Sequence, residues 1–354
     1  MRFSSNRFYI YIESIIINYQ KSDLDLEFLY GIYAANLIYS WGFSKYGQTA
    51  HENTNYILTP SIINFSQTIN SEEFHNKDID LVTGESHSAF LIRDSGDAHV
   101  YMCGKNIFGQ LGLGDNDYIY EPKLLPSLSE KEPVKHLTLG GEHSLILTIY
   151  ANIYSCGLNL FGQLGTGDFE NRTSFTNIKI NENILNDIPT EIVIDIVAGA
   201  QHSLMVTNLN RLYYCGFNKN KFLGINEDIN LFTYIEDNKL MNDKIILIRA
   251  RMNINGVLFE DKKTIAIFGQ DLELINKSSQ IILININDIE DIDNEKLEIK
   301  DFQLGNEFMI ILLTNGKVYS CGINNKNQLG IEDDKIKTNK NDKKLIFYQV
   351  SLPE

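Results

Sequence analysis

Three histidines have closely similar surroundings, since each is followed by a serine and preceded by a glycine three positions earlier. A zinc ion can be held by three histidines when their rings converge. The motif recurs along the chain, however, which favours a structural role such as a ring nitrogen bonding a neighbouring backbone group. Partner contact and metal binding are the alternatives, and we expect no metal. The three copies are Gly84-Glu85-Ser86-His87-Ser88, Gly140-Gly141-Glu142-His143-Ser144 and Gly199-Ala200-Gln201-His202-Ser203.

Ser86 beside His87 comes close to the nucleophile motif of a hydrolase, G-x-S-x-G, but the final glycine is absent. Glu142 and Gln201 replace this serine in the other two copies, whereas the glycine and the histidine recur. The chain also has no G-x-x-x-x-G-K phosphate loop, no dinucleotide fingerprint and no H-E-x-x-H motif. We therefore expect neither a catalytic residue nor a cofactor.

The chain has four cysteines, and no two of them form a C-x-x-C pair. Each stands at the same place in a repeated unit, and equivalent places in different units lie far apart. A disulfide needs Cα atoms within about 7 Å. We expect four reduced, buried thiols and a cytoplasmic or nuclear protein. The residues are Cys103, Cys156, Cys215 and Cys321.

These residues are positioned by short apolar runs that end in glycine. Val100 to Gly104 reads V-Y-M-C-G, and similar runs end at Gly42, Gly157, Gly216, Gly269 and Gly322, at intervals of 53 to 62 residues. The G-x-x-H motifs precede these runs, and N-x-F-G-Q-L-G follows two of them, at Asn106 and Asn159. Runs of 4–6 residues rich in Ile, Val, Leu and Tyr favour strands. The glycines indicate positive φ angles or close backbone approach.

Repeated short strands predict an all-β protein, a β-propeller with six recognisable units and six or seven blades. We expect one propeller domain over residues 1–354. A ring normally joins its two chain ends within one blade, because an unpaired edge invites aggregation. The apolar stretch Phe8 to Tyr19 is expected to be a strand, and Leu345 to Leu352 one that completes unit six. The predicted units are 1–76, 77–130, 131–186, 187–243, 244–295 and 296–354.

The three blocks, in this order, resemble the repeats of the regulator of chromosome condensation family. That family's pattern is a G-x-x-H-S turn, a hydrophobic strand, a Y-x-W-G ending and N-x-x-G-Q-L-G. Units two to four carry it clearly and unit six nearly as well, while units one and five match mainly by spacing. The resemblance implies a seven-bladed propeller, whereas six units are recognisable here. Either the first ~20 residues contribute a degenerate seventh blade, or the ring has six blades.

Net charge and hydropathy limit the classes of partner that we expect the chain to bind. The net charge is −15, with 31 basic against 46 acidic residues, so direct binding to DNA or RNA is not expected. No apolar run reaches the ~18–20 residues of a membrane helix, and we expect no membrane contact. The acidic net charge leaves a basic protein as a partner, since long-range fields speed such encounters, and the family resemblance implies a protein partner that is a small GTPase in some members.

The resemblance implies a protein-interaction propeller, which in some members is a guanine-nucleotide exchange factor. Family exchange factors use acidic and histidine residues at or beside the G-x-x-H turns of one face. The matching positions are expected to bind a partner here and to form an acidic rim. They are Glu85, His87, Glu142, His143, His202 and Glu307.

Three departures favour a scaffold or adaptor over a Ran-type exchange factor. The protruding hairpin that the founding member inserts after one W-G ending is missing after Gly104 and Gly157. A basic N-terminal tail is missing too, and unit five has Asn255 at the expected histidine position and Met252 at the glycine position. The rival class is an enzyme with its active site in the central channel, which would need acid and base groups from several blades.

Overall fold

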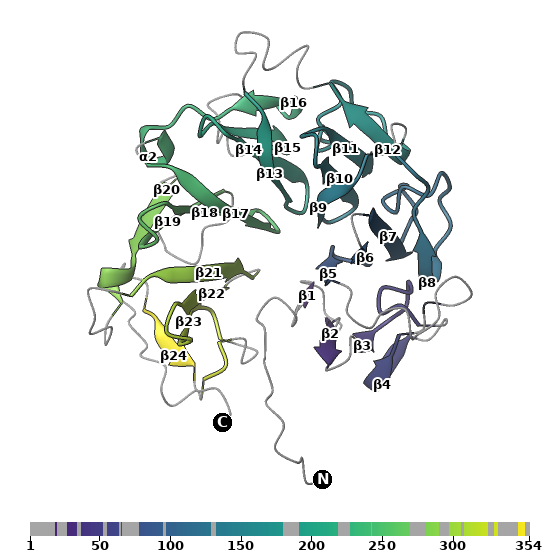
Figure 1. Cartoon of the computed structure of the whole chain (residues 1–354), viewed down its shortest axis with the longest axis horizontal. Helices are drawn as coiled ribbons and strands as arrows, with labels where there is room; N and C mark the ends of the chain where they lie inside the picture. Colours follow the sequence, from purple (N-terminus) through teal and green to yellow (C-terminus); the bar gives the residue numbers. More distant parts are fainter. Residues whose placement is uncertain are drawn as a thin grey trace.

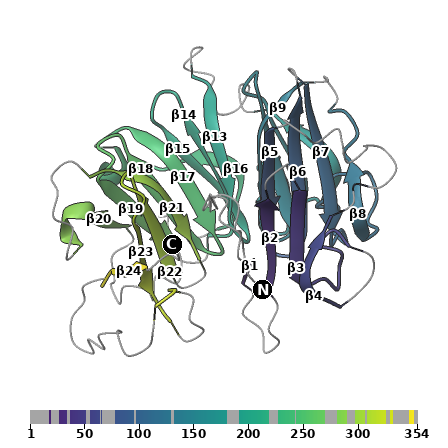
Figure 2. The same cartoon turned by 60° about the horizontal axis from the view of Figure 1, so that its bottom comes forward.

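The computed structural model of the chain shows six four-stranded antiparallel sheets that stand as blades around a central axis (Figure 1). In each sheet the strands follow one another in chain order, with the first strand near the axis and the last at the outer rim. The tilted view shows the strands of a blade running alongside one another, as in β5, β6 and β7 (Figure 2). The structure describes residues 18–19, 27–33, 37–51, 55–63, 65, 78–94, 97–128, 132–179, 191–218, 227–241, 243–269, 281–289, 297–305, 308–324, 329–331 and 346–350.

Each blade has the same four-strand plan. Blade one contains β1 (Asn18–Tyr19), β2 (Glu27–Tyr33), β3 (Leu37–Phe43) and β4 (Tyr56–Ile62). Blade two contains β5 (Asp78–Thr83), β6 (His87–Asp94), β7 (Asp97–Gly104) and β8 (Ile119–Leu124). Blade three contains β9 (Val134–Leu139), β10 (His143–Thr148), β11 (Ile153–Gly157) and β12 (Arg172–Ile178).

The second half of the ring repeats this plan. Blade four contains β13 (Val193–Ala198), β14 (His202–Thr207), β15 (Leu212–Gly216) and β16 (Ile229–Tyr234). Blade five contains β17 (Ile245–Arg251), β18 (Ile254–Phe259), β19 (Thr264–Gly269) and β20 (Ile281–Asn285), flanked by the short helices α2 (Asn238–Met241) and η4 (Ile286–Asp288). Blade six contains β21 (Ile299–Leu304), β22 (Phe308–Leu313), β23 (Val318–Gly322) and β24 (Tyr348–Val350).

The predicted all-β propeller is confirmed, and the described part of the chain forms six blades. The expected C-terminal strand exists, because β24 pairs with β23 and completes blade six. The expectation that one blade contains both chain ends is wrong for the described strands, since every blade is built from four consecutive strands. Of the predicted N-terminal strand, Asn18–Tyr19 pairs with β2, and residues 8–17 lie outside the described residues.

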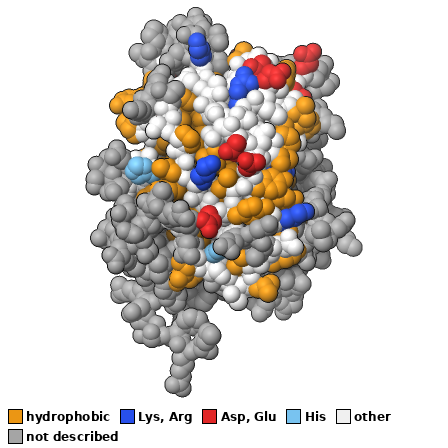
Figure 3. All heavy atoms as spheres, turned by 90° about the vertical axis from the view of Figure 1, so that its right-hand side faces the viewer, with side chains coloured by type: hydrophobic (Ala, Val, Ile, Leu, Met, Phe, Trp, Pro, Cys, Tyr) orange, Lys and Arg blue, Asp and Glu red, His pale blue; other side chains and the backbone are white. Residues whose placement is uncertain are grey.

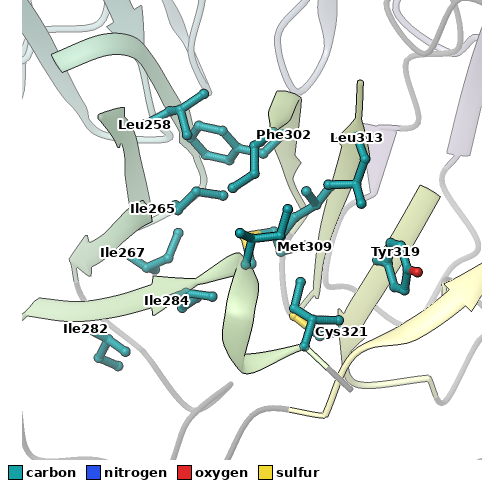
Figure 4. Close-up of a cluster of buried hydrophobic side chains, with 14 of the residues drawn as sticks. Leu258, Ile265, Ile267, Ile282, Ile284, Phe302, Met309, Leu313, Tyr319 and Cys321 are labelled. Atoms are coloured by element: carbon teal, nitrogen blue, oxygen red, sulfur yellow. The ribbon is translucent and has the colours of Figure 1, made fainter. Parts of the chain in front are cut away.

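The core lies between neighbouring blades. The two middle strands of blades three and four, such as β10 and β11, are buried along their whole length, so both of their faces pack. Between blades five and six, Leu258, Ile265 and Ile267 meet Phe302 and Met309 (Figure 4). The buried aliphatic and aromatic side chains thus hold each sheet against the next.

The recurring glycine at the end of the third strand of each blade, one residue before the end in blade one, has a positive φ angle. At Gly157, for example, φ is +108° and a Cβ atom would lie 2.7 Å from the Cα atom of His143. Only glycine adopts such a conformation and such a contact without strain. The predicted reason for these recurring glycines is therefore confirmed. The other five have φ angles of +106° at Gly42, +111° at Gly104, +112° at Gly216, +132° at Gly269 and +125° at Gly322.

The four cysteines are buried on the third strands and carry free thiols. The Sγ atoms of Cys156 and Cys215 lie 3.5 Å and 3.6 Å from the carbonyl oxygens of Gln110 and Gln163. Burial raises the pKa of both thiols, so they are inert packing groups. Within the residues that the structure describes, no helix has the length and apolar character to span a membrane.

Candidate functional site

One end of the ring gathers the turns between the first and second strands and the loops between the third and fourth strands. The backbone N–H of Lys105 donates to Ser86 O (2.8 Å), that of Leu158 to Glu142 O (2.8 Å) and that of Phe217 to Gln201 O (2.9 Å). These bonds hold each loop against the turn of its own blade. We call this end the loop face; the opposite end, which carries the turns between the second and third strands, is the hairpin face.

The three motif histidines lie under the loop face and bond across blade boundaries. His87, His143 and His202 are 0%, 0% and 3% exposed. The Nε2 atom of each lies near a polar atom of the next blade: Ser144 Oγ at 3.0 Å, Ser203 Oγ at 2.9 Å and Asn255 Oδ1 at 2.6 Å. Each ring therefore connects its blade to the following one.

The serines fix which nitrogen carries the proton. Ser144 Oγ donates to the backbone carbonyl of Gln110 (2.6 Å), and Ser203 Oγ donates to that of Gln163 (2.7 Å). A hydroxyl has one proton, so each serine must accept from the histidine, whose proton is then on Nε2. The Oδ1 atom of Asn255 is likewise an acceptor. The three rings are assigned as neutral Nε2–H tautomers.

Burial keeps these rings neutral. It lowers the pKa of His87 and His143 to about 3 and that of His202 to about 4. A buried ring whose Nε2–H is already engaged cannot reach a partner. The predicted structural role fits this geometry, and the inclusion of the three histidines among the partner-binding residues is corrected for this reason.

The glycine three positions before each histidine makes room for the ring. A Cβ atom at Gly84, Gly140 or Gly199 would overlap the imidazole of its own motif, and one at Gly305 would overlap the Phe308 ring. These pairs explain why glycine and an aromatic ring recur together. The glycine is a requirement of packing at these positions.

Strand register corrects the reading of blade five. Ile254 pairs with Gly269 as His143 pairs with Gly157, so Ile254 occupies the histidine position. Asn255 then corresponds to the serine that follows the histidine, and the glycine position, three residues before Ile254, is Arg251. The prediction that Asn255 and Met252 occupy the histidine and glycine positions is therefore wrong by one residue. The side chain of Arg251 fits at the glycine position because blade five has Ile254, and no aromatic ring, at the histidine position.

Glu85 and Glu142 lie on the loop face, but each has a cation nearby. Glu142 forms an ion pair with Lys105, and the two side chains are 26% and 18% exposed. Burial lowers the pKa of Arg251, and the negative charge of Glu85 opposes that shift. Lys105 thus balances the charge of Glu142, and the acidic rim at Glu85 and Glu142 stays a prediction. Glu307 lies outside the described residues.

A row of half-buried aromatic rings follows the loop face from blade to blade. Tyr46 packs against Tyr118 (ring centroids 5.5 Å apart), and Phe161 packs against Phe217 (4.9 Å). The ammonium group of Lys105 lies 5.8 Å from the rings of both Tyr46 and Phe108. The aliphatic side chains beside Phe108 and Phe161 reach solvent: Ile107 is 40% exposed and Leu160 is 63% exposed.

Sequence reasoning missed these apolar side chains. Their signal was present, since the second position of N-x-F-G-Q is apolar in both complete copies, Ile107 and Leu160. Aromatic and aliphatic side chains on an exposed rim are typical of a protein-binding surface.

A second group of ionisable residues lines a cavity of about 360 Å³ formed by the inner strands of blades three to five. His136 Nδ1 lies 2.8 Å from Asp195 Oδ1, and Arg249 pairs with Asp301 at 3.0 Å. These pairs join blade three to four and blade five to six. The described lining contains no Ser, Thr, Cys or Tyr that could act as a nucleophile beside His136. Because each pair joins two neighbouring blades, we assign both pairs to the contacts between blades.

Comparisons with known proteins identify the same repeat. Models of the regulator of chromosome condensation (RCC1) repeat match residues 97–147, 151–206 and 299–328. The chain is 30% identical over 181 residues to the X-linked retinitis pigmentosa GTPase regulator of Mus musculus, which covers 51% of this chain and 17% of that protein. It is 27% identical over 208 residues to the RCC2 homolog of Xenopus laevis, covering 54% and 38%. The chain thus spans less than two fifths of these relatives.

Solved structures share the fold. Human WBSCR16 aligns with a TM-score of 0.71 at 18% identity, over 92% of this chain and 80% of that one. Prp20p of Saccharomyces cerevisiae aligns with a TM-score of 0.68 at 15% identity, over 92% and 75%. Prp20p binds Gsp1p and histones.

Proposed function

We propose, because this chain belongs to the regulator of chromosome condensation repeat family, that it is a regulatory or adaptor propeller that binds a protein partner at its loop face. One observation carries the proposal: the loop face exposes apolar side chains beside a row of aromatic rings. Truncation of a few buried anchors, with aromatic residues prominent among them, is what most weakens protein interfaces. Strand interiors are committed to packing, so loops supply specificity.

The second candidate is guanine-nucleotide exchange on a small GTPase. The likeness to Prp20p, which binds Gsp1p, supports this candidate. Against it, the chain after Gly104 and Gly157 turns directly into compact loops, closed by Gly109 N–H to Asn106 O (2.9 Å) and Gly162 N–H to Asn159 O (3.0 Å). We therefore favour the adaptor. The cytoplasmic or nuclear location stays a prediction.

Affinity capture with a matched pair of variants tests the proposal. Leu160→Asp places a charge on the loop face, and Tyr150→Asp places one on the hairpin face, where Tyr150 is 67% exposed. We expect the full-length chain and Tyr150→Asp to retain the same protein from cell extract, and Leu160→Asp to lose it. A partner that Leu160→Asp retains and Tyr150→Asp loses would contradict the proposal.

Exchange activity is tested separately. Release of a fluorescent GDP analogue from a Ran-type GTPase is measured with and without the chain. Release at the spontaneous rate agrees with the adaptor role. A large acceleration would instead establish the exchange-factor candidate.

A further inference from the structure

Each loop of blades two and three is a rigid frame. The buried Asn106 accepts from Leu111 N–H (2.9 Å) and donates to the Asp115 carbonyl (2.9 Å). Asn159 makes the same two bonds, with Leu164 (2.9 Å) and with the Asp168 carbonyl (2.9 Å). The loops are thus held in one conformation from inside, and little conformational entropy is lost when they bind a partner.

Neighbouring blades also fix these loops in place. Gly114 N–H donates to Thr173 O (2.9 Å), and Gly167 N–H donates to Asn230 O (2.8 Å). Each loop therefore lies against the outer strand of the next blade. The two loops present equivalent side chains at equivalent places, one blade apart.

The same two loops also carry exposed carboxylates. The inner acids are balanced, since Asp168 pairs with Arg172 at 2.6 Å and Asp115 lies 3.7 Å from Lys123. Two positions further on, the exposed Asp117 and Glu170 have carboxylates without a cationic partner among the described residues.

The apolar part of the surface repeats at one loop position, and blade three adds Phe169 where blade two has Asn116. Ile107 and Leu160 stand at the same loop position and are 40% and 63% exposed, and Phe169, next to Glu170, is 49% exposed. The outer wall on the side of β8 likewise mixes hydrophobic side chains with carboxylates and cations (Figure 3). Each loop thus offers an exposed apolar side chain and an exposed carboxylate that has no cationic partner among the described residues.

From this arrangement we infer that the loops of blades two and three bind a protein segment in which Lys or Arg side chains flank an apolar side chain. The inference rests on the proposed function and names the chemistry of its partner. The apolar side chain would be buried against Ile107, Leu160 and Phe169, which supplies affinity. The basic side chains would face Asp117 and Glu170, which speeds association and sets specificity.

Because the two loops are equivalent, the number of binding patterns in a partner segment should affect its affinity. A segment that carries the pattern twice can engage both loops at once, and the second contact is then intramolecular. We expect a tandem segment to bind at least tenfold more tightly than a single one.

Peptide display on the purified full chain tests the inference without a known partner. Random 16-residue peptides are selected, and the tightest are measured by fluorescence anisotropy against wild type and variants. We expect selected peptides to contain Lys or Arg on both sides of a large apolar residue. Leu160→Ser with Phe169→Ser should weaken their binding at least tenfold, and Tyr150→Ser, the hairpin-face control, should leave it unchanged.

A second double variant tests how much the two carboxylates contribute to peptide binding. Asp117→Lys with Glu170→Lys should weaken binding at least fivefold at low salt and much less at 0.5 M salt, because exposed charges are screened. Selected peptides without net positive charge that still bind at Leu160 would overturn the inference and leave the proposed function standing. Peptides that depend on Tyr150 instead would overturn both.

Discussion

The Nε2 atom of His87 lies 3.0 Å from the Oγ atom of Ser144, which belongs to the next blade. His143 and Ser203 repeat this relationship one blade further, and His202 and Asn255 repeat it again with an amide oxygen as acceptor. Because each serine also donates to the loop of the preceding blade, one side-chain pair ties together two blades and the base of a loop. The histidines thus support the loop face from beneath it.

Replacement of Ser144 by alanine should destabilise the protein by about 1–3 kcal/mol, because it removes the serine hydroxyl that accepts from the buried Nε2–H of His87. Ser88→Ala is the matched control. Ser88 Oγ donates to Gln48 O (2.8 Å), but the residue of blade one at the histidine position is Phe28. Urea unfolding should show the larger loss for Ser144→Ala, and equal losses would argue against the histidine contact.

The neutral histidines predict acid sensitivity. Their folded-state pKa values of about 3 to 4 lie below the ordinary value of 6.5, so the folded state binds fewer protons than the unfolded state. This contribution to stability is fully present above about pH 6.5 and is lost as the pH falls towards about 4. Urea unfolding at pH 7.5 and pH 5.0 should show lower stability at pH 5.0. His202→Gln should reduce the difference, and a stability that does not change over this range would contradict the assignment.

The overlap of glycine and ring predicts a coupled pair. Gly140→Ala should destabilise the protein by about 1–3 kcal/mol, because the new methyl group overlaps the His143 ring. In the double variant with His143→Ile, the methyl group should cost much less, as blade five tolerates Arg251 with Ile254. A double-mutant cycle measures this coupling, and strictly additive losses would show that the ring is not the obstacle.

The hairpin turns offer a stabilising change. Ala151 has a φ angle of +66°, and Gly316 takes the corresponding place in blade six at +83°. Glycine adopts this region at no steric cost, so Ala151→Gly should stabilise the protein by up to about 1 kcal/mol. The melting temperature should rise by a few degrees. A fall would show that the entropy of glycine in the unfolded chain outweighs the relief of strain.

The repeat made most of the fold predictable, because glycine spacing marks each blade even where the other motif residues are lost. The bonds from His87 and His143 to serines 57 and 60 residues away were not predictable, since they are contacts between blades. For the same reason the cation that balances Glu142 could not be seen: Lys105 comes from the preceding blade. The predicted motif positions in blade five were wrong by one residue, because this blade lacks both the glycine and the aromatic ring that mark the motif elsewhere. Its register became visible only through the pairing of Ile254 with Gly269.

Hydrogen–deuterium exchange of the full chain, with and without its captured partner, tests the loop face as the binding surface most directly. We expect partner-dependent protection in the loops at 105–118 and 158–171, with unchanged exchange in the hairpin turns at 149–152 and 208–211. Protection confined to those hairpin turns, with the loops unchanged, would contradict it.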